Sequence, residues 1–201
     1  MNKHGFLFAL LLGGALAVSS LNGCQTGSSV QNVSVKWEQN YDTLAQLRFF
    51  KASGRVAIIT ARERKGAAYD INGFGSGFVF NINAPLGPSI AQVTVTDNRL
   101  SLAMDGKTYE DDTARAVFEK AFGIDVPVDR IKRIFLGIPQ GDLKRDSEGR
   151  ITGAMWDGFD IGYEGSVTTD GITIPQIITV VHGPYTLKLS VIEFNPGKLS
   201  K

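Results

Sequence analysis

The chain has 201 residues, and 21 Lys and Arg stand against 20 Asp and Glu, so its formal net charge is +1. This balance argues against a nucleic-acid partner and a polybasic membrane patch, since both need an excess or cluster of basic charge. Arg130, Lys132 and Arg133 cluster locally, and we assign them to a solvated helix face. A single cysteine excludes an internal disulfide.

The N-terminus has the pattern of an export signal. Lys3 and His4 precede an uncharged, largely apolar run over 5–20. This run is shorter than the roughly 20 apolar residues that span a bilayer, and its flanks are typical of a secretory signal peptide. It ends in residues 21–24, Leu-Asn-Gly-Cys, which resemble the lipobox of bacterial lipoproteins. We therefore expect cleavage of residues 1–23 and lipidation of Cys24.

An ordinary signal peptide followed by a cysteine is the alternative. We favour lipidation because Cys24 is the sole cysteine, and a lone thiol in an exported protein needs a purpose. Two or three acyl chains such as palmitate make membrane attachment lasting. Gln25, where Asp would favour inner-membrane retention, fits the outer membrane. The expected location is a lipid anchor in that membrane, facing the periplasm.

Two further segments follow the cleavage site. Residues 24–34 are polar, and we interpret them as a lipidated flexible tether that spans on average roughly 17 Å. Residues 35–201 contain no second linker and no internal repeat, so we expect one domain there.

Apolar periodicity predicts one helix and then several strands. Trp37, Tyr41, Leu44, Leu47 and Phe49 recur at helical spacing. Strands are then expected at 56–60, 77–83, 91–95 and 100–104, with a turn at 62–66 and an Asp105-Gly106 hairpin turn into 107–109. In the strand over 77–83, Phe78, Phe80 and Ile82 fall on one face. The glycine-rich run 73–77 is interpreted as a bend in a curved sheet.

The middle of the chain is expected to be helical. Asp111, Asp112 and Thr113 offer N-cap chemistry to a helix over 114–122 that Gly123 ends, and a second helix runs from Pro127 to about Phe135. Strands follow near 151 and at 159–163, 173–181 and 185–194. Such an antiparallel meander closes or half-closes into a barrel.

The helical insertion is strongly apolar, and two interpretations stay open from the residues alone. Either its side chains complete a filled core, which composition favours, or they form a lid over a cavity for apolar ligands. The residues concerned are Val117, Phe118, Phe122, Ile131, Ile134 and Phe135.

Several motifs, in order along the chain, are similar to those of the LolB family of outer-membrane lipoproteins. They begin with Trp37 and the sequence FKASGRV. The others are the Asn-Ala-Pro-Leu-Gly loop over 83–87, residues 121–128 and 135–139, the Gly-Phe and Tyr-Glu-Gly elements at 158–165, Pro175, and the closing alternation to Phe194. Phe135, Phe159 and Phe194 stand where the family commonly has Trp.

The resemblance implies a mainly β fold with α (α+β), an unclosed antiparallel β half-barrel of about eleven strands with lid helices over a hydrophobic cavity. It implies a receptor that takes acylated lipoproteins from the periplasmic carrier LolA, transiently and as a monomer, and inserts them into the inner leaflet of the outer membrane. The acyl-cavity candidates are Phe78, Phe80, Ile82, Val93, Phe118, Phe122, Ile131, Ile134 and Phe135.

Leu86 is a separate candidate. Pro85, Gly87 and Pro88 predict a turn around it, and from the residues alone this leucine would fold back onto the core. The resemblance implies instead that Leu86 protrudes from a membrane-insertion loop with Pro85 and Gly87.

Enzymatic function is not expected. The only histidine beyond the signal, His182, lies in a strand-like run, and the chain has neither a Gly-x-Ser-x-Gly elbow nor a phosphate-binding P-loop. We therefore expect no catalytic residue, no metal, and no cofactor besides the acyl chains on Cys24. The alternative function is an accessory outer-membrane lipoprotein of an envelope assembly, with a filled core and no lipid ligand.

Overall fold

The computed structural model describes residues 35–84, 87–96, 99–122 and 130–197, which all lie in the unit Ser34–Lys201. This unit contains every described core residue, so a fragment that begins at Ser34 keeps all contacts of the fold below. Its helices are α1 (Trp37–Gln46), α2 (Asp111–Phe122) and α3 (Ile131–Phe135). No helix in the described ranges is both long and apolar enough to cross a membrane.

The strands divide into a large sheet and a small ribbon. The first half of the chain forms β1 (Phe49–Ile59), β2 (Arg64–Phe74), β3 (Gly77–Asn83), β4 (Ser89–Thr96), β5 (Arg99–Met104) and β6 (Lys107–Glu110). The second half forms β7 (Asp142–Arg145), β8 (Ile151–Trp156), β9 (Phe159–Glu164), β10 (Val167–Thr169), β11 (Ile172–Ile174), β12 (Ile177–His182) and β13 (Tyr185–Pro196).

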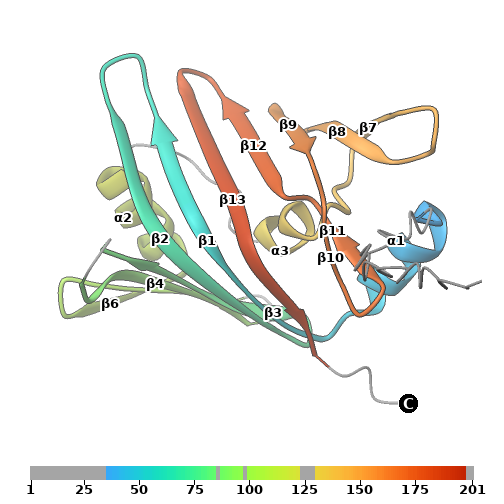
Figure 1. The fold of residues 1–201 in the computed structure, drawn as a ribbon. Coiled ribbons are helices and arrows are strands. Elements are labelled where there is room, and N and C mark those ends of the chain that lie inside the picture. Colours follow the sequence, from blue (N-terminus) through green and yellow to red (C-terminus); the bar gives the residue numbers. More distant parts are fainter. Residues whose placement is uncertain (1–34, 85–86, 97–98, 123–129, 198–201) are drawn as a thin grey trace, which may run out of the picture. The chain divides into compact units, whose positions relative to one another are not determined.

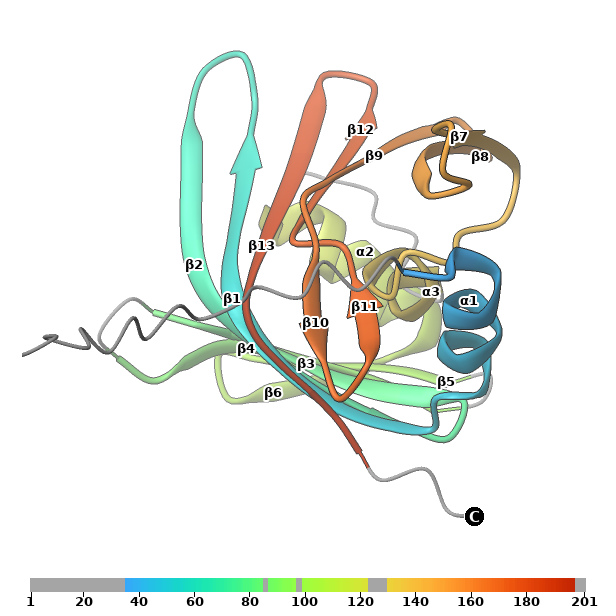
Figure 2. The ribbon, with the colours of Figure 1, turned by 45° about the vertical axis from the view of Figure 1, so that its right-hand side comes forward.

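Eleven strands form one antiparallel sheet in the order β6-β5-β4-β3-β2-β1-β13-β12-β9-β8-β7, and β10 pairs only with β11. The first and last strands of the order are separate edges, so the sheet is open. In Figures 1 and 2 it curves so that β3 to β6 pass beneath α2 and α3, while β1, β2, β12 and β13 rise beside them. The predicted half-barrel with helices is confirmed.

The centre of the sheet is the pair β1 and β13, which join the two halves of the chain. Their register shifts between Ser53 and Gly54 of β1, which pair with Glu193 and Val191, so that Ile192 of β13 is the extra, unpaired residue. A β-carbon at Gly54 would lie 1.9 Å from the carbonyl oxygen of Ser190, so only glycine fits there. Bulges of this kind bend a strand and increase its twist, which favours the curvature of this sheet.

Alternation along the strands determines which face is buried. In β3, Phe78, Phe80 and Ile82 are buried, as predicted. Opposite them, β4 buries Ala91, Val93 and Val95. The Asp105-Gly106 hairpin is also confirmed, since both residues have positive φ angles, 52° and 71°, as a type I′ turn requires.

Two predicted boundaries are wrong. Phe49 is not helical: Leu47 has extended backbone angles that end α1, and Phe49 begins β1 with its side chain 52% exposed. The run 173–181 is not one strand, because Pro175 separates β11 from β12. Proline has no N–H to donate to a strand ladder, so it interrupts such a run.

Other differences concern where the helices begin, one turn and the strands that were not predicted. Helix α2 begins at Asp111, three residues earlier than predicted, and the Asp111 carboxylate accepts the N–H of Leu100 at 3.1 Å. Within 130–135, only Ile131–Phe135 is α-helical, and Gly123 and Pro127 lie outside the described residues. The run 73–77 holds the turn between β2 and β3. The strand β2 was not predicted, and residues 64–66, which were expected in a turn, instead pair with residues 57–59 of β1. The edge strand β7 and the three-residue β10 were not predicted either, because such short segments show little alternation.

Candidate functional site

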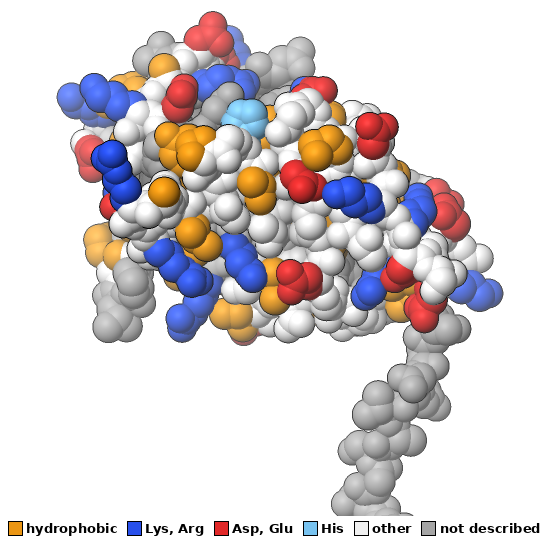
Figure 3. All heavy atoms as spheres, turned by 90° about the horizontal axis from the view of Figure 1, so that it is seen from above, with side chains coloured by type: hydrophobic (Ala, Val, Ile, Leu, Met, Phe, Trp, Pro, Cys, Tyr) orange, Lys and Arg blue, Asp and Glu red, His pale blue; other side chains and the backbone are white. Residues whose placement is uncertain are grey.

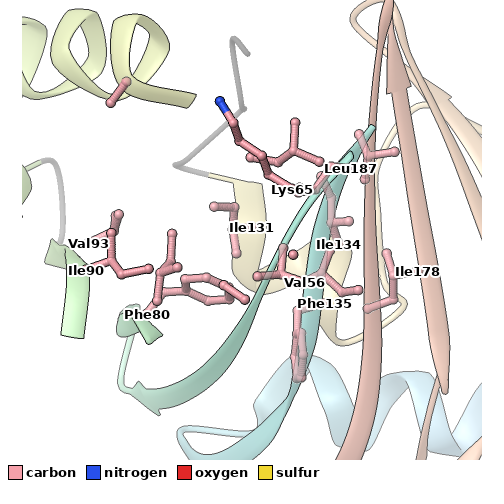
Figure 4. A pocket seen from close by; sticks show the side chains of 17 residues that line it. Val56, Lys65, Phe80, Ile90, Val93, Ile131, Ile134, Phe135, Ile178 and Leu187 are labelled. Carbon is pink, nitrogen blue, oxygen red and sulfur yellow. The ribbon is translucent and has the colours of Figure 1, made fainter. Parts of the chain in front are cut away.

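A cavity of about 360 Å³ lies on the concave side of the sheet, between the strands and α3 (Figure 4). Among the described residues that line it, only Lys65 is charged. The others are apolar side chains and one glycine: Val56, Ile58, Gly66, Ala67, Phe80, Ile82, Ile90, Val93, Ala121, Ile131, Ile134, Phe135, Ile178, Val180, Leu187 and Leu189. Its volume falls within the range of about 300–1,000 Å³ that is usual for small-molecule sites.

The cavity has a buried floor and an exposed rim. Phe80, Phe135 and Ile178 belong to the floor, because each is almost completely buried. At the rim, the side chain of Ile90 is 43% exposed, and that of Lys65 is 66% exposed. The cavity therefore opens to solvent at a rim that combines apolar surface with one cation.

Strand pairing explains why distant residues share this cavity. Val56 of β1 lies opposite Ala67 of β2 on one side and Leu189 of β13 on the other. Ile178 of β12 in turn pairs with Leu189. Alternate side chains of a strand point to the same face, so four neighbouring strands present an apolar row to the interior.

Helix α3 closes the floor, and ring stacking and two hydrogen bonds help to hold it in place. The ring of Phe135 stacks on Phe50 at a centroid distance of 5.8 Å. The buried hydroxyl of Tyr163 donates to the Ile134 carbonyl at 3.0 Å, and burial raises the pKa of Tyr163, which keeps this donor protonated. The Lys132 ammonium donates to the carbonyl of Gly75, and burial lowers the pKa of Lys132.

Six of the nine predicted cavity residues line this cavity: Phe80, Ile82, Val93, Ile131, Ile134 and Phe135. Phe78 is buried in the core but does not line the cavity. The side chains of Phe118 and Phe122 lie outside the described residues. The residues of β1, β2, β12 and β13 were missed, although alternation in 56–60 and 185–194 indicated strands, because nothing local shows which strands are neighbours.

The candidate insertion loop is described only at its ends. Cys24, Pro85 and Leu86 lie outside the described residues. Gly87 is exposed, and its N–H donates to the Ala84 carbonyl at 3.3 Å, while the Ala84 N–H donates to the Pro88 carbonyl at 3.2 Å. These bonds hold the two ends of the loop together. Ile90, which follows closely in β4, lies at the cavity rim.

The remaining candidate residues have structural contacts. His182 Nδ1 lies 3.2 Å from the carbonyl oxygen of Gly158, and its ring stacks on Phe159 at 4.3 Å. Phe159 and Phe194, two of the positions where the LolB family commonly has Trp, are core residues. Within the described ranges, no group of three or more His, Cys, Asp or Glu could hold a metal ion.

Solved structures with this arrangement include a LolA superfamily protein from Nitrosomonas europaea. It superposes with a TM-score of 0.52 at 10% identity, over 81% of this chain and 94% of that protein. A DUF1329 family protein from Desulfovibrio piger superposes with a TM-score of 0.50 at 8% identity. At such low identity these likenesses support the fold alone.

Sequence comparison identifies the family. The outer-membrane lipoprotein LolB of Aeromonas hydrophila is 24% identical over 173 residues, 85% of this chain and 89% of that protein. The LolB of Pseudomonas aeruginosa strain PAO1 is 23% identical over 198 residues, 93% of this chain and 96% of that protein. The family model described as "Outer membrane lipoprotein LolB" matches residues 48–193. The chain therefore belongs to the LolB family of outer-membrane lipoproteins.

Proposed function

We propose that this protein receives lipoproteins from the periplasmic carrier LolA by binding their acyl chains in the cavity, and then inserts them into the outer membrane. The observation that carries the proposal is an apolar cavity, of about 360 Å³, that opens to solvent at its rim. A filled core, which the accessory-lipoprotein alternative requires, would leave no such space.

The energetics of acyl chains support a direct transfer. A triacylated lipoprotein carries on the order of 45 methylenes, each of which gains about 0.8 kcal/mol on leaving water. Exposure of all of them would cost tens of kcal/mol, so free diffusion through the periplasm is excluded. The chains must pass from the carrier's cavity to this cavity and from here to the bilayer. Neither step needs ATP if each acceptor binds the chains slightly better.

The N-terminal segment of the chain would determine where the protein is located. Cleavage before Cys24 and acylation of its sulfur and nitrogen would anchor the protein in the outer membrane, with residues 24–34 as a tether and residues 35–201 as one domain. The domain could then turn between a periplasmic donor and the bilayer. In this role the protein acts as a monomer, without catalysis and without a cofactor.

A binding assay with fluorescent palmitate on the fragment Ser34–Lys201 tests the cavity. Saturable binding that acylated lipoprotein competes away is the expected result. Ala67→Phe places a ring into the cavity and should weaken binding at least tenfold. Ala68→Phe is the matched control, because residue 68 points to the opposite face of β2. An unmodified fragment that binds no palmitate would favour the accessory lipoprotein without a lipid ligand.

Leu86 is proposed to dip into the membrane interface during delivery. An apolar residue at a loop tip can enter the headgroup region and bring a nearby rim to the bilayer. Leu86→Glu should abolish transfer of lipoprotein cargo to liposomes while palmitate binding and the circular dichroism spectrum stay unchanged. Intact delivery by this folded variant would contradict the role of Leu86.

A further inference from the structure

A second hollow, of about 470 Å³, lies on β1, β2 and β13, and three cations line it: Arg55, Arg64 and Lys188. We propose that this hollow binds the phosphate of an anionic lipid headgroup at a membrane surface. The proposal goes beyond acyl binding in the cavity and does not depend on it.

Strand register places the three cations on the convex face. Val56, Ala67 and Leu189 line the apolar cavity, and their pairing defines the concave face. Residues one position away point to the other side. Arg55 is therefore convex, opposite Ser190, and Lys188 is convex, opposite Ala57. Arg64 reaches the same face opposite Ile59.

Most of the uncharged residues that line the hollow are small: Ala57, Gly66, Ala67, Ala68 and Ser190, besides Val56. Ala57, Gly66 and Ala68 line it between the cations. A β-carbon at Gly66 would meet nothing closer than the Val56 carbonyl at 3.7 Å, so the surface here has room for a ligand group. Guanidinium groups bind phosphate oxygens with two parallel hydrogen bonds, and a lysine adds a point charge.

Among the described residues, no ion pair within 4 Å includes Arg55, Arg64 or Lys188. The ion pairs there join other partners, and the nearby Glu63 binds Lys65 at 2.9 Å. Asp70 on β2 is occupied by amide groups, with Asn81 donating at 2.8 Å and Asn83 at 3.0 Å. In Figure 3, Lys and Arg side chains lie over the left part of the view, the side of β1 and β2 in Figure 1, with a few Asp and Glu side chains among them. The hollow therefore attracts an anion.

Its surroundings favour a lipid surface over other anions. The next cross-strand row contains Ile59, which pairs with Thr186, and Val181, which pairs with Thr186 from the other side and is 37% exposed. Apolar side chains beside cations are typical of surfaces that lie in a membrane interface. A nucleic acid would need many phosphate contacts, and the formal net charge is only +1.

The hollow and the cavity rim share one stretch of β2. Arg64 and Gly66 face the hollow, and Lys65 between them lines the rim. A lipid headgroup bound on the convex face would therefore hold the cavity rim at the membrane surface. There, an acyl chain that leaves the cavity would enter the bilayer.

The test is sedimentation of the fragment Ser34–Lys201 with vesicles of phosphatidylcholine alone or mixed with phosphatidylglycerol. We expect binding that needs phosphatidylglycerol and weakens with salt. The triple variant R55Q/R64Q/K188Q should bind about a hundredfold more weakly, since each basic residue near an anionic leaflet contributes roughly fivefold. The control R48Q/R99Q/K107Q makes the same charge change at exposed sites elsewhere and should bind like the parent.

Several results would overturn the proposal. Equal binding by the two triple variants would show that only net charge matters. Unchanged vesicle binding with loss of carrier binding would assign the hollow to a protein. Calorimetric binding of inorganic phosphate as tight as that of vesicles would assign it to a free anion. Palmitate binding by R55Q/R64Q/K188Q should remain unchanged, which also reports that the variant is folded and that the cavity is separate.

Discussion

At the scale of single residues, Asn40 shows how a polar side chain stabilises an apolar fold. It is buried, its amide N–H donates to the Thr173 carbonyl at 2.8 Å, and its oxygen accepts the Thr173 N–H at 2.8 Å. The side chain thus completes the hydrogen bonding of β11 and attaches α1 to it. Tyr41 adds a second attachment, since its hydroxyl accepts the N–H of Ile151 at 2.6 Å.

Asn40→Ala should lower the free energy of unfolding by about 1–3 kcal/mol, because it leaves two buried backbone groups without partners. Urea denaturation of the fragment Ser34–Lys201 measures this loss. Gln39→Ala, at the exposed neighbouring position, should change stability by less than about 0.5 kcal/mol. Equal effects of the two substitutions would show that the Asn40 bonds contribute nothing specific.

Buried tyrosines make stability depend on alkaline pH. Burial raises the pKa of Tyr69 above its ordinary value of 10.0. The folded protein therefore keeps this proton when the unfolded chain has lost it. The contribution is fully present below about pH 10 and is lost as pH rises towards the folded pKa, by about 1.4 kcal/mol per pH unit. Chemical denaturation of Tyr69→Phe between pH 9 and 11 should show a shallower decline than the parent, and an identical decline would contradict this assignment.

At the scale of elements, the open sheet has two edges, and both are short and charged. The edge strand β6 has the sequence KTYE and β7 has the sequence DLKR. Unpaired N–H and C=O groups at an edge favour pairing with another chain, and charged side chains oppose it. These residues explain how a half-closed sheet can stay monomeric, which is the state we propose.

Removal of the charged side chains from one edge strand should allow that strand to pair with another chain. K107V/E110V removes both charged side chains of β6, and we expect concentration-dependent association in light scattering at concentrations where the parent is monomeric. Thr108→Val is the control, because it makes an exposed residue of the same strand apolar and keeps both charges. Association by the control alone, or by neither variant, would show that edge charge is not what protects this sheet.

At the scale of the whole molecule, the sheet depends on its last strand. β13 pairs with β1 from Phe50 with Pro196 to Ile59 with Thr186, so the first and the last strand of the sequence lie side by side at its centre. Deletion of residues 185–201 should therefore abolish the native near-ultraviolet circular dichroism signal, since it removes a central strand and not an edge. Deletion of residues 1–33 should leave that signal intact. A native signal from the C-terminally truncated chain would contradict this account.

Much of the fold and part of the candidate site could be predicted, and the rest depended on distant contacts. The alternation in β3 and the Asp105-Gly106 turn are local, so the sequence by itself determined them. Ordered motifs likewise indicated the LolB family. The boundary at Phe49 was missed because Phe49 fits the helical spacing equally well, and the outcome was decided by pairing with Phe74 of β2.

Only the tertiary structure decided which strands are neighbours, and therefore which side chains from distant parts of the sequence lie together. Val56, Ile178 and Leu189 line one cavity because β1, β12 and β13 are neighbours in the sheet. Arg55 and Lys188 gather on the opposite side for the same reason, although the chain shows no basic cluster there. The physical reason is that a strand's own pattern specifies which side chains share a face, whereas the strand beside it is chosen by pairing and burial across the whole chain.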